Sequence, residues 1–160
     1  MRKTAFNRNK IQLDVCRAIM DGNRRCSMCE ITDNEIAITV DGYTAYVFSK
    51  NECVFDFKKI AEAQGLKKYF EDAENDTEIK PSGELFKVDS DAIAEKYIGE
   101  NLEIFLNTKI VEKFKDLRLY ANNERGRILA KDCFGRIIAL FLPMSPNCVL
   151  HYKKGGGSDA

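Results

Sequence analysis

Four potential zinc ligands occur in two pairs in this sequence. Cys26 and Cys29 form a Cys-x-x-Cys motif, and Cys148 and His151 form a Cys-x-x-His motif. Together they would suit the tetrahedral coordination of Zn²⁺. However, the pairs are far apart in the sequence, and each lies in or beside a predicted strand, where residues i and i+3 point to opposite faces. The alternative interpretation is reduced cysteines packed as small apolar side chains, and we expect no cofactor.

Basic side chains recur along the first predicted helix. Lys10 and Arg17 are two helical turns apart on one line, and Arg24 extends this line if the helix continues. An exposed line of cations would contact phosphates and give salt-sensitive binding of nucleic acid without sequence readout. The alternative interpretation is the solvated outer face of an ordinary helix.

The usual catalytic motifs are absent from the sequence. It contains no Gly-x-Gly-x-x-Gly, P-loop, Gly-x-Ser-x-Gly or His-Glu-x-x-His pattern, and its single histidine argues against His-driven acid–base chemistry. Carboxylates are dense at residues 71–76, but a polar run of this kind predicts a solvated loop rather than a buried acid–base pair. We therefore expect a protein that is not an enzyme.

The spacing of apolar residues predicts the elements that carry these side chains. Residues 7–21 are predicted to form a helix, and a second helix is predicted to begin at Asn107 or Thr108 and to extend to Leu117. Asp41-Gly42 predicts a hairpin turn. Each half of the chain thus has an extended lead, a helix and at least three strands. The predicted strands are residues 27–31, 35–40, 44–49, 53–57, 102–106, 117–121, 127–132, 136–142 and 148–152.

The middle of the chain is predicted to be an acidic insertion that separates these halves. Residues 58–70 are predicted to be helical, and residues 89–97 are predicted to form a short helix capped by Ser90. Between them, residues 71–84 are predicted to form a mobile acidic loop, because they contain the turn sequence Pro81-Ser82-Gly83.

The charge of the chain is unevenly distributed although its total is zero. The 25 Lys and Arg residues balance 25 Asp and Glu residues, yet residues 1–25 and 104–160 each carry +5 and residues 71–103 carry −8. The length of 160 residues suits one domain with a sizeable core. Because no apolar run reaches the ~18 residues of a membrane span and no signal-peptide core is present, we expect a cytoplasmic protein without a membrane partner.

The C-terminal part of the chain resembles the end of a bacterial DNA polymerase sliding clamp in the order of its elements. This part comprises residues 105–114, two further predicted strands and the apolar segment 138–144. That end consists of a strand, a short helix and strands that close in Met-Pro-Met or a similar sequence. Residues 36–45 also resemble the strand and the Thr-Asp-Gly turn of clamp domains. The resemblance covers roughly residues 26–50 and 102–144, less than half of the chain.

The resemblance implies both a fold and a set of contacts. A clamp domain has two βαβββ halves, so the implied fold is a single α+β domain over residues 1–154, with halves at about 1–57 and 101–153. The segment at about 58–100 is then an acidic helical insertion that has no counterpart in the family, and the glycine-rich residues 155–160 are predicted to be a flexible tail. In the family, helices contact DNA phosphates, and residues near the closing proline line a pocket for peptides of replication proteins. The implied DNA contacts are Lys10, Arg17, Lys109 and Lys113, with Arg24 continuing the first line. The implied peptide pocket contains Leu142, Pro143 and Met144.

These observations favour a non-enzymatic binding module that resembles one sliding-clamp domain and acts in DNA replication or in a phage or other mobile element. The implied partners are duplex DNA and replication proteins. One domain cannot encircle DNA, so a ring would require a homo-oligomer. The alternative is a small protein-interaction or inhibitor domain that binds a basic partner through the acidic middle segment and does not bind DNA.

Overall fold

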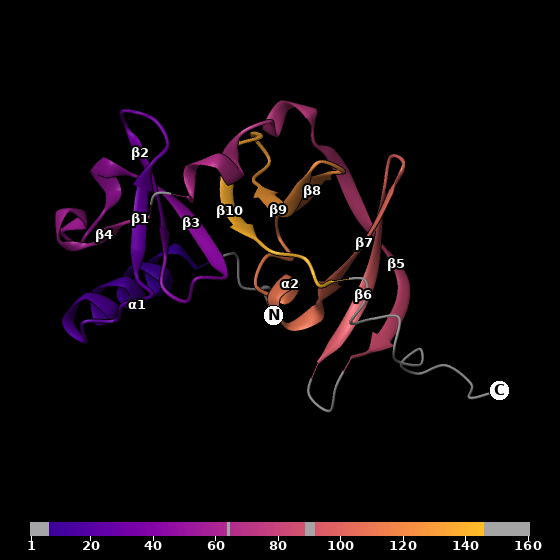
Figure 1. The fold of residues 1–160 in the computed structure, drawn as a ribbon, viewed down its shortest axis with the longest axis horizontal. Coiled ribbons are helices and arrows are strands. Elements are labelled where there is room, and N and C mark those ends of the chain that lie inside the picture. The colour runs from indigo at the N-terminus through magenta and orange to yellow at the C-terminus, as the bar shows by residue number, and fades with distance from the viewer. Residues whose placement is uncertain (1–6, 64, 89–91, 146–160) are drawn as a thin grey trace.

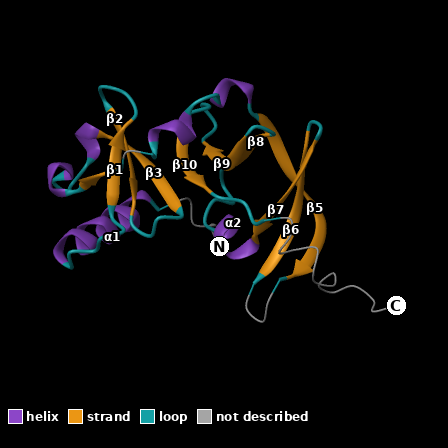
Figure 2. Ribbon diagram, in the orientation of Figure 1, coloured by secondary structure: helices purple, strands orange, loops and turns teal. Residues whose placement is uncertain are grey.

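The computed structural model describes residues 7–63, 65–88 and 92–145, which contain two α-helices and ten strands (Figure 1; Figure 2). The helices are α1 (Arg8–Met20) and α2 (Thr108–Glu112). The strands are β1 (Ser27–Glu30), β2 (Glu35–Thr39), β3 (Thr44–Ser49), β4 (Ala61–Glu62), β5 (Thr77–Lys87), β6 (Ile93–Gly99), β7 (Leu102–Asn107), β8 (Arg118–Asn122), β9 (Arg125–Lys131) and β10 (Ile137–Phe141). The predicted strand 148–152 and the predicted tail 155–160 lie outside the described residues.

Each of the two helices begins at an asparagine side-chain cap. Asn7 accepts a hydrogen bond from the N–H of Lys10 at the start of α1, and Asn107 accepts one from the N–H of Lys109 at the start of α2. Helix α1 matches the prediction, whereas α2 ends at Glu112, well before the predicted end at residue 117. Neither described helix is long and apolar enough to cross a membrane.

The strands form one mostly antiparallel sheet in the order β4-β1-β2-β3-β10-β9-β8-β5-β6-β7. Helix α1 precedes the antiparallel strands β1, β2 and β3, and α2 precedes β8, β9 and β10. These two groups meet where β3 pairs antiparallel with β10, with Tyr46 opposite Ala139. The predicted mixed α+β class is therefore confirmed.

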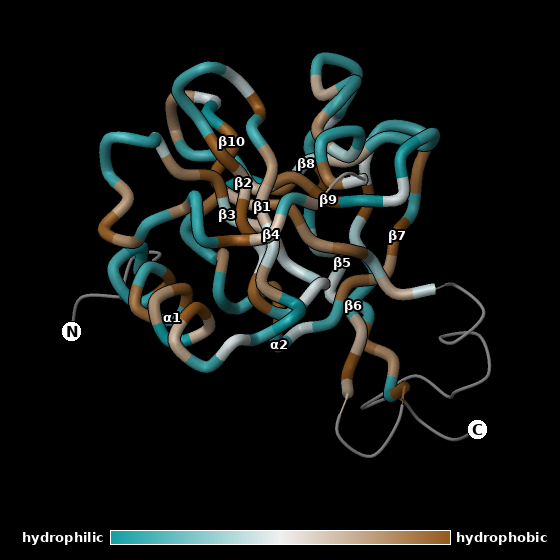
Figure 3. Tube along the Cα trace, turned by 60° about the vertical axis from the view of Figure 1, so that its left-hand side comes forward, coloured by the Kyte–Doolittle hydropathy of each residue, from teal (hydrophilic) through white to brown (hydrophobic). Residues whose placement is uncertain are grey.

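Both helices cover the same face of the sheet. Val15 of α1 and Phe114, just after α2, share one core with Phe48 and Ile128, and we call this the helix-side core. The neighbouring residues on the same strands, such as Leu129, point into a second core on the other face, because side chains alternate along a strand. Figure 1 and Figure 3 agree in placing α1 and α2 together on one side of the strands.

A short helical segment covers the opposite face of the sheet. Leu66, Tyr69 and Phe70 pack there against the second core, which contains Ala37, Val47, Leu129 and Leu140 of the central strands. We call this the far-side core. The predicted helix at residues 58–70 is wrong, because this region consists of 3₁₀ turns and the two-residue strand β4. The predicted strand at residues 53–57 is also absent from the described residues.

The acidic middle of the chain is largely β-sheet, which corrects the predicted acidic helical insertion. Residues 77–87 form β5 instead of part of a mobile loop, and residues 93–99 form β6 instead of a helix. The backbone of β5 pairs with β8 at one end and with β6 over the rest of its length. These ladders outweigh the low strand propensity of the acidic residues, since sheet propensity depends strongly on context.

The turn sequence inside β5 is accommodated by an irregularity rather than by a loop. Gly83 has a φ of 86°, which favours glycine, and the pairing register between β5 and β6 shifts between Pro81 and Leu85. The Ser82 hydroxyl donates a hydrogen bond of 2.7 Å to the Lys96 carbonyl across the strands. The Pro-Ser-Gly sequence therefore marks a bulge within a strand.

Candidate functional site

The five residues of the predicted DNA-contact set are all exposed in the structure: Lys10, Arg17, Arg24, Lys109 and Lys113. None of them forms an ion pair with another described side chain. Five cations that form no ion pair can contact an external anion at low cost, because no existing ion pair has to be broken.

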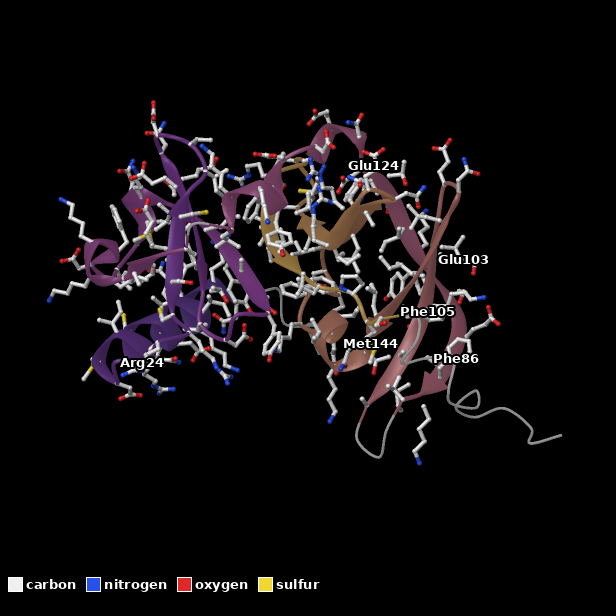
Figure 4. All side chains as sticks on the ribbon, viewed as in Figure 1. Arg24, Phe86, Glu103, Phe105, Glu124 and Met144 are labelled. Atoms are coloured by element: carbon white, nitrogen blue, oxygen red, sulfur yellow. The ribbon has the colours of Figure 1, made fainter. Side chains whose placement is uncertain are left out.

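These cations belong to the side of the protein that carries the helices. Lys10 and Arg17 lie on α1, whose buried residues face the sheet, and Lys109 and Lys113 lie on α2 and at its C-terminal cap. Figure 4 places Arg24 beyond the C-terminal end of α1. We call this set of five cations the helix-side basic set.

Other charged side chains on α1 change the electrostatic potential around the helix-side basic set. Arg8 is ion-paired with Glu52 and stacks over the Phe48 ring, with 4.9 Å from its guanidinium carbon to the ring centroid. It therefore contributes little free charge. Half-buried Asp14 lies four residues after Lys10 and three before Arg17, where it partly offsets their potential.

Lys59, another cation next to the basic set, is missing from the sequence prediction. Lys59 and Arg24 line the same pocket of about 200 Å³ at the C-terminal end of α1, together with Cys26 and Ile60. The sequence pattern placed Lys59 in a helix of the insertion, so nothing linked it to α1. The signal that identifies it is the parallel pairing of β4 with β1, which brings residues 59–61 beside this end of the helix.

The three predicted peptide-pocket residues separate after β10. Leu142 lines a shallow pocket of about 80 Å³ with Tyr43 and Tyr69. The N–H of Met144 instead donates a hydrogen bond of 2.8 Å to the carbonyl of Phe105 on β7. Its side chain packs in a small apolar cluster with Phe86 and Phe105 (Figure 4). Pro143 connects the two places, so the described structure does not gather the three into one pocket.

The Cys-x-x-Cys motif is split between the two faces of the sheet. Cys26 packs in the helix-side core, and Cys29 packs in the far-side core. Burial raises the pKa of both thiols, which favours the neutral form that packs as an apolar group. The other two candidate zinc ligands, Cys148 and His151, lie outside the described residues. Within the described ranges, no group of three or more His, Cys, Asp or Glu residues has a metal-binding arrangement.

Comparisons of the chain with protein-family models, with curated proteins and with solved structures find no match. The fold and the surface describe a mixed α+β protein that has two helices on one face of a large sheet and exposed cations on and beside those helices.

Proposed function

We propose that this protein is a non-enzymatic module that binds duplex DNA through the phosphates, using the helix-side basic set. The observation that carries the proposal is the location of the two helices on one face of the sheet, with five exposed cations that have no ion-pair partner among the described side chains. Lysine and arginine side chains on such a surface bind the phosphate backbone by releasing its condensed counterions.

The order of the elements supports a sliding-clamp-like arrangement of two halves. Strand β7 leads into α2, β8, β9 and β10, while α1 leads into β1, β2 and β3. The last strands of the two halves, β3 and β10, pair antiparallel at the centre of the sheet, as expected when two similar units are related by a twofold rotation. A lead strand for the first half would fall at residues 1–6, outside the described residues.

The chemistry of the helix-side basic set favours contacts to the DNA backbone over base readout. Helix α2 has only five residues, too short to present a recognition surface to the major groove. Phosphate contacts position a protein on duplex DNA without reading its sequence. This is the behaviour required of a module that moves along DNA during replication, in a phage or another mobile element.

A complete ring would require further copies of the chain or other proteins. With two helices on its basic face, one chain can contact only one side of a duplex. We therefore propose that homo-oligomers or replication partners complete the assembly on DNA.

The paired substitution Lys10→Glu with Arg17→Glu tests this proposal. We expect at least about a tenfold loss of affinity for a 30-base-pair duplex at low salt, measured by fluorescence anisotropy, because two phosphate contacts become repulsive. The matched control is Lys67→Glu with Lys68→Glu, which changes two exposed lysines in the segment that covers the opposite face. Equal affinity losses in the two double variants, or no loss in the first, would reject the proposal.

A further inference from the structure

The ladder between β3 and β10 ends before either strand does. Its pairs connect residues 44–46 with residues 139–141, although β3 continues to Ser49 and β10 begins at Ile137. Beyond the last pair, the guanidinium of Arg8 donates a hydrogen bond of 3.0 Å to the carbonyl of Val47. The two strand groups therefore separate at this point, and a side chain replaces part of the missing strand pairing.

A cavity of about 510 Å³ opens where the strands separate, and we call it the junction pocket. Its volume is within the range of about 300–1,000 Å³ that is typical of small-ligand sites. Aliphatic lining comes from both strand groups and from the turn after α2. These aliphatic residues are Val47, Leu117, Ile137 and Ile138.

The charged lining of the junction pocket is predominantly acidic. Four carboxylates line it (Glu35, Glu52, Asp116 and Asp132), against the two guanidiniums of Arg8 and Arg136. Both guanidiniums are already paired within the pocket, Arg8 with Glu52 and Arg136 with Asp132 at 2.9 Å. Neither Glu35 nor Asp116 has an ion-pair partner among the described side chains. The pocket therefore has two carboxylates to offer to a bound cation.

The carboxylate of Asp132 remains ionised near neutral pH. Partial desolvation raises its pKa, but hydrogen bonds from the backbone and side chain of Arg136 and from the N–H of Phe134 outweigh this, so the pKa lies below its ordinary value. The bonds to Asp132 also hold the β9–β10 turn as one wall of the junction pocket.

We infer that the junction pocket binds a basic peptide segment of a partner protein. An arginine or lysine of the segment pairs with Glu35 or Asp116, and an adjacent apolar side chain packs on the aliphatic lining. The aliphatic lining favours a peptide over a bare cation, because the half-buried side chains of Leu117 and Ile137 can be buried further only against an apolar surface on the ligand. The acidic excess repels phosphates, so this site is separate from the helix-side basic set and does not depend on DNA binding.

Calorimetric titration of the whole protein with short peptides tests the inference. We expect acetyl-Leu-Arg-Leu-amide to bind, and acetyl-Leu-Gln-Leu-amide and acetyl-Leu-Glu-Leu-amide to bind at least about tenfold more weakly, because they lack the cation. The substitutions Glu35→Gln with Asp116→Asn should weaken binding of the arginine peptide at least about tenfold. The matched control, Asp33→Asn with Glu74→Gln, removes two exposed carboxylates outside the pocket and should leave binding unchanged.

Three results would overturn the inference. The first is no binding of the arginine peptide at millimolar concentration, and the second is equal binding of the glutamine peptide. The third is unchanged affinity in the Glu35→Gln, Asp116→Asn variant. If a simple alkylguanidine bound as tightly as the peptide, the ligand of the junction pocket would be a small organic cation instead of a peptide. Thermal melting of both double variants checks that they remain folded.

Discussion

The guanidinium of Arg127 and the carboxylate of Asp76 form an ion pair of 2.6 Å in which neither side chain is exposed to solvent. Arg127 also donates hydrogen bonds of 2.7 and 3.1 Å to the carbonyls of Tyr69 and Glu71. Asp76 accepts a further bond of 2.6 Å from Asn122. These bonds attach residues 69–76 to β8 and β9, so this acidic part of the chain is held against the sheet.

The substitution Asp76→Ala should lower the free energy of unfolding by about 3–5 kcal/mol, because it leaves the buried charge of Arg127 without a counter-ion. Urea unfolding followed by circular dichroism measures this loss. The neighbouring control Glu74→Ala removes an exposed carboxylate and should change the free energy of unfolding by less than about 0.5 kcal/mol. A loss below about 1 kcal/mol for Asp76→Ala would contradict the anchoring role.

A double-mutant cycle separates the ion pair from the other bonds of the network. Replacing Arg127 by Met together with Asp76→Ala removes both buried charges, so the double variant should lose less stability than the two single variants added together. Some loss should remain, because the Tyr69 and Glu71 carbonyls then lack their charged donor. Strict additivity of the two single losses would show that the pair is not coupled.

The substitution Phe114→Ala should cost about 3–5 kcal/mol of stability, because it creates a cavity in the helix-side core. The ring is only 1% exposed and stacks on Phe141 with 5.3 Å between centroids. Phe134→Ala is the matched control, since that ring is 81% exposed on the β9–β10 turn. Denaturant unfolding should show a midpoint shift for the first variant and almost none for the second.

The described cysteines should differ in reactivity. Burial raises the pKa of Cys53 to about 11, with a smaller contribution from the Glu52 carboxylate. At pH 8 only about one thiol in a thousand is then ionised, and since the thiolate is the reactive form, alkylation of Cys53 should accelerate about tenfold for each pH unit up to that pKa.

Iodoacetamide at pH 8 should therefore modify the exposed Cys133 well before Cys53, Cys26 or Cys29. Peptide mass mapping at successive times measures the order of modification. Modification of Cys53 at the same rate as Cys133 in the folded protein would contradict the partial burial and the raised pKa of Cys53.

The sequence was sufficient to predict the regular elements of the two strand groups. Alternating apolar residues between strong turn signals, such as Asp41-Gly42, define β2 and β3, and the Asn107 cap locates the start of α2. Local signals failed for β5, because Pro81-Ser82-Gly83 has the composition of a loop and only pairing with β6 and β8 makes the segment a strand.

The buried ion pair and the junction pocket could not be predicted for a related reason. Asp76 has the same sequence context as its exposed neighbour Glu74, and only the approach of β9 distinguishes them. The junction pocket depends on where the β3–β10 ladder ends, which is a property of tertiary packing. In contrast, the helical spacing of Lys10 and Arg17 was enough to predict that they share one line of α1, and the structure shows that both are exposed there.

The most direct test of DNA binding by the helix-side basic set is the salt dependence of the association constant for duplex DNA. Fluorescence anisotropy between about 20 and 200 mM NaCl gives the slope of log K against log salt concentration. We expect a slope of about −3 to −5 for the wild-type chain, and a slope shallower by about 2 for Lys10→Glu with Arg17→Glu, since each phosphate contact contributes about one unit. An identical slope in the double variant, or no binding of the wild type at 20 mM NaCl, would contradict the proposal.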